Sequence, residues 1–173
     1  MTLVAATLES ELLKLFDSSS ASFVGYPTTA IAAANNWANA YDAYAKTAMD
    51  MSGDLLVTAN KAGFASTLIS QLPTDPTVGS YVNAANAFDA AFIIYWTAAI
   101  FAFIPPEASS IVTVIVPSTL ANLLLPTFSD ITAAGTAQIK AQQMAAAFHA
   151  ATTTAVTVTI SYVVGPAVLS KLF

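Results

Sequence analysis

The stretch from Pro76 to Pro106 constrains the fold of this chain more than any other, because proline stands at both of its ends. Proline suits the first turn of a helix, where its missing N–H is no loss, and the Pro105-Pro106 pair cannot continue one. Between them apolar residues recur at steps of three and four, and from Phe92 onward the other faces are apolar as well. The spacing predicts one long helix over about 76–104, which must be buried on all sides in protein or in lipid.

The segments before this stretch also show helical periodicity. They predict helices over 2–17, 28–51 and 54–72, joined by short turns rich in serine, glycine and proline. Short turns favour antiparallel neighbours, so we expect a bundle around the long helix. Small residues on one side of the second helix, from Ala34 to Ala48, would allow close approach of another helix. We expect packing within the domain there, with a seam between subunits as the alternative.

After Pro106 the pattern changes to β-branched residues. A strand is predicted over 110–116, then a short helix that Pro126 ends, a helix over 133–151 and a strand over 155–164. The predicted fold class is α+β and predominantly α: one domain over 1–173, with a helical bundle around the long helix and a small β element. An isolated two-stranded ribbon is marginal in water, so these strands should pack on the helices or on a neighbouring chain.

Composition narrows the function classes. The chain is 56% hydrophobic and only 9% charged, against about 25% charged residues in typical soluble domains. A surface so poor in charge suits an oligomer, a component of an assembly or a membrane protein. The net charge is −5 and arginine is absent, so the chain lacks the basic clusters that bind nucleic acid directly. Cysteine is absent too, which excludes disulfides and thiolate chemistry.

No residue pattern indicates catalysis, so we expect no enzyme, cofactor or metal site. His149, the single histidine, has no carboxylate or serine at a telling spacing and is interpreted as structural. Asp42, Asp50 and Asp54 lack the spacing of a calcium loop and are interpreted as helix caps or solvated residues. Asp89 is expected on a polar side of the long helix; if buried, it would need a donor.

A membrane role is the alternative reading, as in a small pore-forming, holin-like protein. The uncharged run from Ala90 to Ile104 spans only roughly 22 Å as a helix, against about 30 Å of hydrocarbon. Extending it would carry Asp89 into the lipid, and no lysine lies between Lys61 and Lys140. Burial in protein is therefore favoured over burial in a membrane.

The order of several segments resembles a family. AAANNWANAYDAYA precedes a long helix holding FDAAFIIYW; a β-branched run, TLANLL and QQMAAAFHAATT follow, and the last passes into VTVTISYVVGP. This arrangement, over about residues 28–166, resembles small uncharacterised virion structural proteins of tailed bacteriophages. The resemblance implies a component of the tail, neck or capsid, assembled in the host cytoplasm. It implies partners that are further copies and other virion proteins, and it carries over no catalytic residue.

The last segment is the predicted interface. Val156, Val158, Ile160, Tyr162 and Val164 form one apolar face of the last strand, and the tail from Ala167 to Phe173 is apolar as well. Strands of this kind can add to a partner's sheet edge. The predicted interface residues are Val156, Val158, Ile160, Tyr162, Val164, Leu169, Leu172 and Phe173. The alternative, weighted equally, is that strand and tail close the domain's own core.

Overall fold

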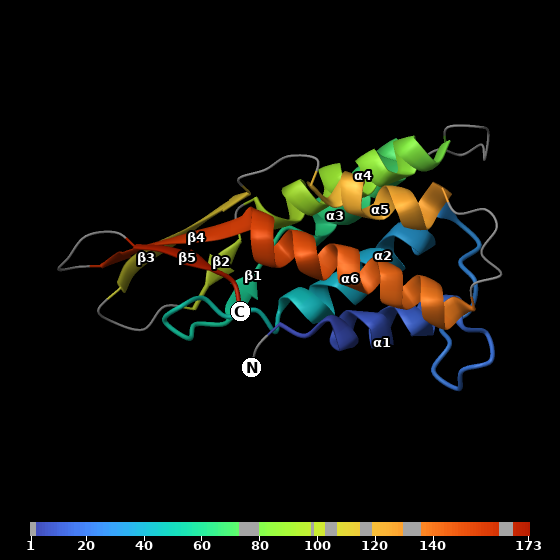
Figure 1. Cartoon of the computed structure of the whole chain (residues 1–173), viewed down its shortest axis with the longest axis horizontal. Coiled ribbons are helices and arrows are strands. Elements are labelled where there is room, and N and C mark those ends of the chain that lie inside the picture. Colours follow the sequence, from blue (N-terminus) through green and yellow to red (C-terminus); the bar gives the residue numbers. More distant parts are fainter. Residues whose placement is uncertain are drawn as a thin grey trace.

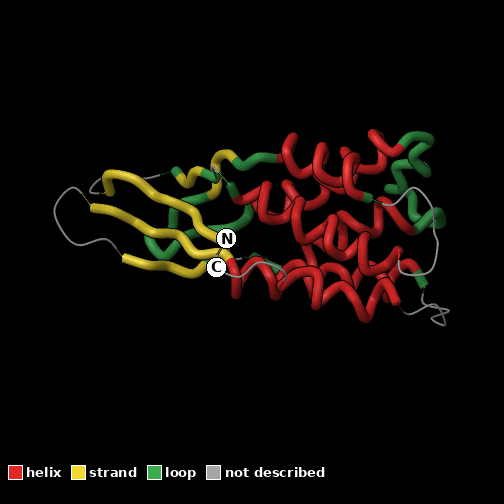
Figure 2. Tube along the Cα trace, turned by 90° about the horizontal axis from the view of Figure 1, so that it is seen from above, coloured by secondary structure: helices red, strands yellow, loops and turns green. Residues whose placement is uncertain are grey.

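A computed structural model describes residues 3–72, 80–97, 99–102, 107–114, 119–129, 136–162 and 168–173. Figure 1 shows a helical body with the strands gathered at one end, and Figure 2 shows the same division from above. The chain is predominantly helical with a small antiparallel β element, as predicted. The described elements are α1 (Ala5–Phe16), α2 (Ala30–Ala45), β1 (Leu56–Thr58), α3 (Lys61–Gln71), α4 (Ser80–Trp96), β2 (Ile100–Phe101), β3 (Glu107–Val114), α5 (Thr119–Ser129), α6 (Ala137–Ala155), β4 (Val156–Tyr162) and β5 (Val168–Lys171).

The second predicted helix is too long, because α2 ends at Ala45 instead of continuing to Met51. Thr29 caps its start by accepting from the Ala32 N–H. Beyond its end the chain reverses in a turn, where an Asp50 carboxylate oxygen accepts from the Ser52 and Asp54 N–H groups. Gly53 has φ +90°, a conformation that glycine adopts without strain. The alanines of the predicted packing side, Ala34, Ala38 and Ala45 in α2 and Ala48 just after it, are buried within the chain, as expected.

The third predicted helix begins too early. Its first residues form β1, and Asn60 rather than Asp54 caps α3, accepting from the Gly63 N–H at 2.8 Å. The reason is tertiary, because β1 pairs antiparallel with β2, with Leu56 opposite Phe101. Both of those side chains are buried. Pairing across the chain therefore overrides a weak local helical pattern.

The long helix is not confirmed as a single element, because α4 ends at Trp96. Ile100 and Phe101 form β2, and the Ala102 N–H donates to the Leu55 carbonyl at 2.9 Å. A short run of apolar residues without a polar side is compatible with either a helix or a buried strand. Here the pairing with β1 selects the strand. Residues 76–79, 98 and 103–104, which the prediction also covered, lie outside the described residues.

Pro126 lies inside α5, which continues to Ser129, so the prediction that proline ends this helix is wrong. The helix is held by its neighbours: the Lys140 ammonium of α6 donates to the Thr127 carbonyl at 3.1 Å. Helix α6 follows the prediction over 137–151 and extends to Ala155. Strand β4 begins at the very next residue, Val156, so no loop separates helix from strand.

The larger sheet has the order β3-β4-β5, with both pairs antiparallel. Strands β3 and β4 contain the predicted strands over 110–114 and 156–162. Ala155, predicted as the first residue of the last strand, is instead the last residue of α6, and the predicted residues 115–116 and 163–164 lie outside the described part. The register places Val112 opposite Val158 and Thr159 opposite Leu169. The tail therefore supplies a third strand, and the central strand has both of its edges paired.

The core of the helical body is built from aromatic rings around Tyr41. Its ring packs at centroid distances of 4.9–6.1 Å against the rings of Tyr44, Phe64, Phe92, Tyr95 and Phe148, which come from α2, α3, α4 and α6. All six side chains are buried. Among the described residues, no helix combines the length and the hydropathy needed to cross a membrane.

Candidate functional site

A buried chain of hydrogen bonds runs through the aromatic core. The Trp96 indole N–H donates to the Tyr41 hydroxyl at 2.9 Å, and this hydroxyl lies 2.9 Å from Thr152 Oγ1. Thr152 in turn donates to the Phe148 carbonyl at 2.7 Å, which fixes the direction: Tyr41 donates to Thr152. Each polar group has its partner, so this network stabilises the junction of α2, α4 and α6 and leaves no group poised for chemistry.

Asp42 forms a second network beside the first. The Tyr95 hydroxyl donates to one carboxylate oxygen at 2.9 Å, and the other oxygen lies 2.9 Å from the Lys46 ammonium and 3.8 Å from that of Lys61. Asp42, Asp50 and Asp54 are all buried, so the interpretation of these residues as solvated is wrong. Asp50 organises the turn that follows α2 instead.

Burial controls the ionisation of three core tyrosines. Removal from water raises the pKa of Tyr41 well above its usual value, and the adjacent Tyr44 raises it further. Burial likewise raises the pKa of Tyr44. For Tyr95, burial raises the pKa most, followed by the negative charge of Asp42. All three side chains are therefore neutral donors or acceptors at physiological pH, not general bases.

The other singled-out polar residues also have structural roles. His149 Nδ1 lies 2.8 Å from the Tyr44 hydroxyl, which ties α6 to α2. Asp89 is buried, contrary to the polar-side interpretation, and one of its oxygens accepts from the Leu120 N–H at 3.0 Å and the Ala121 N–H at 3.4 Å. It thus caps α5 from the neighbouring helix. The described part of the chain contains no cluster of histidine and acidic residues able to hold a metal ion.

The predicted interface residues divide into three groups. Val156, Val158, Ile160 and Leu172 are buried in the chain's own core, so their side chains are not available to a partner in this fold. Tyr162 and Leu169 lie in strands β4 and β5, and Val164 falls outside the described residues. Phe173 alone is shown to be exposed. Three side chains of the strand and Leu172 of the tail therefore pack in the chain's own core, and a contact of residues 155–173 with another chain stays a prediction.

The exposed apolar surface at this end lies on a different set of residues. Phe173 and Met49 exchange two backbone hydrogen bonds, of 3.0 and 3.1 Å, and Met49 forms an antiparallel bridge with Leu55 on its other side. Residues paired in this way project their side chains on the same face of a sheet. Val57 and Ile100 continue the exposed surface along β1 and β2. We call the exposed residues Leu55, Val57, Ile100 and Phe173, together with the half-buried Met49 that links Leu55 to Phe173, the outer row.

Exposed residues of the outer row and buried core residues are next to each other in the sequence. Leu55, Val57, Ile100 and Phe173 are 47–52% exposed, whereas their immediate neighbours Leu56, Phe101 and Leu172 are at most 4% exposed. The sequence did not predict the outer row, because in these segments the residues on the exposed side and those on the buried side are both apolar. Without a polar side, the sequence does not show which side faces the solvent. Only pairing between segments distant in the sequence separates the two sides.

Comparison of the chain with models of protein families, with curated proteins and with solved structures gave no match.

Proposed function

We propose that this chain is a structural subunit of a protein assembly, specifically a bacteriophage virion component of the tail, neck or capsid. It acts by self-association and by packing against other virion proteins. The outer row is the observation that supports this proposal. Four large apolar side chains that each expose about half of their surface amount to roughly 400 Å², the size of the largest patch on a typical monomer, which is often functional.

A second copy fits this surface by its chemistry. The outer row contains no charged side chain, so two copies can meet face to face without burying an unpaired charge. A standard interface buries about 800 Å² per partner, so the row would form the apolar centre and surrounding polar residues the rim. The buried polar networks of the helical body support the same proposal, because each stabilises the fold and none presents a reactive group.

The test is light scattering of the purified chain at micromolar concentration, across a range of salt. We expect an oligomer that persists at high salt, because apolar contacts are not screened. Val57→Lys should weaken self-association about tenfold or more, since it places a charge at the centre of the contact. The matched control is Ile139→Lys on α6, where an exposed isoleucine lies outside the outer row.

A monomer at tens of micromolar under all salt conditions would contradict self-association, and equal effects of the two lysine variants would contradict the outer row as its location. The virion role is tested separately, by mass spectrometry of purified particles of the phage that encodes the chain. Absence of the chain from such particles would refute that role while leaving self-association intact.

A further inference from the structure

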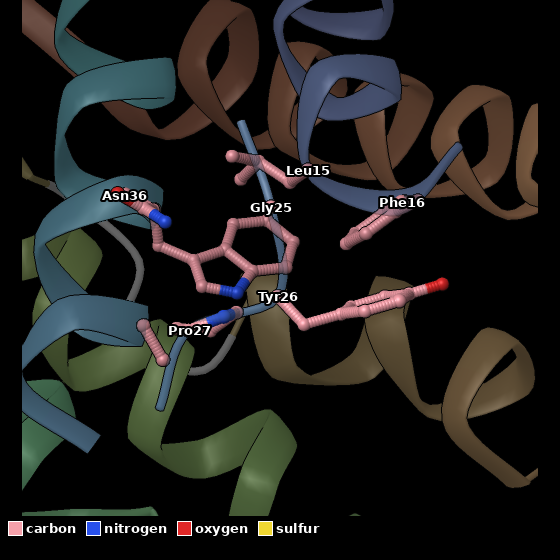
Figure 3. Close-up of a pocket in the computed structure, with 8 residues that line it drawn as sticks. Leu15, Phe16, Gly25, Tyr26, Pro27 and Asn36 are labelled. Carbon is pink, nitrogen blue, oxygen red and sulfur yellow. The ribbon is translucent and has the colours of Figure 1, made fainter. Parts of the chain in front are cut away.

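A pocket of about 320 Å³ lies at the opposite end of the first two helices from the strands, between the end of α1, the loop that follows it and the start of α2. The loop is fixed as its outer wall: the Val24 N–H donates to the Lys14 carbonyl at 3.0 Å. Gly25 has φ +86°, which turns the chain and carries Tyr26 and Pro27 over the opening. Figure 3 shows the rings of Phe16 and Tyr26 on one side of the pocket and Asn36 on the other.

The lining is aromatic and uncharged. Phe16, Tyr26 and Trp37 contribute rings, and the other lining residues are Leu15, Gly25, Pro27, Ala33 and Asn36. Trp37 forms a firm wall, because its ring packs 4.8 Å from that of Phe88 and 5.4 Å from that of Phe16. A ring that enters would meet several aromatic neighbours, and such pairs prefer edge-to-face or offset contact. No lining residue is charged, so the lining favours a neutral ligand over an ion.

Size and free polar groups define the ligand further. The volume is at the lower end of the roughly 300–1,000 Å³ that small-molecule sites occupy, which suits one or two fused rings rather than a long chain. Within the described part of the chain, neither the Asn36 amide nor the Trp37 indole N–H has a hydrogen-bond partner. Both can therefore serve one polar atom on the ligand.

We propose that this pocket is a binding site for a small neutral aromatic molecule that carries one hydrogen-bond acceptor. The rings of Phe16, Tyr26 and Trp37 hold the aromatic part, and Asn36 or Trp37 donates to the acceptor. The site is independent of the outer row, which lies at the strand end of the molecule.

Equilibrium dialysis with acetophenone tests the proposal and does not depend on the size of any assembly. We expect a Kd on the order of 1 mM for so small a ligand. The isosteric probe α-methylstyrene replaces the carbonyl oxygen by a methylene group, which removes the acceptor but makes the probe more hydrophobic. Relative to their transfer from water into hydrocarbon, acetophenone should therefore bind several-fold more favourably than α-methylstyrene. Absence of acetophenone binding at about ten times that Kd would overturn the site, and probe affinities that follow transfer from water alone would overturn the acceptor.

Variants locate the binding. Ala33→Leu extends a lining side chain into the pocket and should weaken acetophenone binding about tenfold. The matched control is Ala43→Leu at an exposed position of the same helix, which should leave the Kd unchanged. Should Ala33→Leu fail to fold, Tyr26→Ala removes an exposed wall residue and should weaken binding several-fold, against Tyr81→Ala as its control. Binding that neither pocket variant weakens would place the probe elsewhere and overturn the proposal.

Discussion

The helical body and the strand end use the same apolar composition in opposite ways. In the body, apolar side chains interlock around Tyr41, and the buried polar groups beside them bond one another. At the strand end, apolar residues occupy both sides of short paired segments, so one side is buried and the outer row is left exposed. An apolar fraction of 56% therefore does not by itself indicate a large core, because part of it forms surface. Three predictions test this division, from the largest expected effect to the smallest.

High pH should unfold the body. Tyr41, Tyr44 and Tyr95 have pKa values raised by burial, so above pH 10 they ionise in the unfolded chain but not in the folded one. Their contribution to stability is fully present below pH 10 and is lost as pH rises above it. We expect the free energy of unfolding to fall by on the order of 3–4 kcal/mol per pH unit there, measured by denaturant titration.

Variants show whether the core tyrosines cause that fall. Tyr95→Phe should reduce the slope with pH by about one third, since it removes one of three titrating groups. Tyr26→Phe, which removes the same hydroxyl from an exposed tyrosine outside the core, is the matched control. Phenolate absorbance that shows all tyrosines ionising near pH 10 in the folded chain would refute the buried network.

Truncation of a body ring should cost more than truncation of its exposed neighbour. Phe92 is 1% exposed, so Phe92→Ala should lower the free energy of unfolding by about 3–5 kcal/mol through lost burial and the cavity left behind. Ile94→Ala, two residues along the same helix at a 36% exposed side chain, should cost less than about 1.5 kcal/mol. Equal losses would mean that α4 is covered on both sides.

Two adjacent residues distinguish core from surface at the strand end. Leu172 is 3% exposed, and Leu172→Ala should cost about 2–4 kcal/mol in unfolding free energy. Phe173 is 52% exposed, and Phe173→Ala should cost less than about 1 kcal/mol while weakening self-association. Chemical denaturation of both variants measures the free energy of unfolding, and light scattering measures their self-association. A larger loss of unfolding free energy for Phe173→Ala than for Leu172→Ala would contradict the assignment of Leu172 to the core and Phe173 to the surface.

Local signals in the sequence predicted the elements with a strong period, and tertiary pairing decided the rest. Helix α6 and strand β4 follow from clear 3.6-residue and two-residue periods. The end of α4 could not be predicted, because Ile100 and Phe101 suit helix and strand alike until β1 is in place. The role of Asp89 could not be predicted either, because the N–H groups that donate to its carboxylate, those of Leu120 and Ala121, lie some thirty residues away in α5.

The outer row shows the same limit at the candidate site. Strand β4 has the clearest alternation of polar and apolar residues, and its apolar residues Val156, Val158 and Ile160 are buried. The exposed apolar residues Leu55, Val57 and Ile100 lie in segments where polar and apolar residues do not alternate. Periodicity identifies a face that differs from its opposite. Where both faces are apolar, only the position of other segments determines which one meets the solvent.

The direct passage from α6 into β4 makes the two ends of the molecule mechanically continuous. Helix and strand share one uninterrupted run of backbone, and α6 is fastened to α2 by the Tyr41–Thr152 and Tyr44–His149 contacts near its end. No loop separates this helix from this strand, so the sheet is not joined to α6 through a flexible linker. A force that a bound partner applied to the sheet would therefore act directly on the last turns of α6 and, through the Tyr41 and Tyr44 contacts, on the aromatic body.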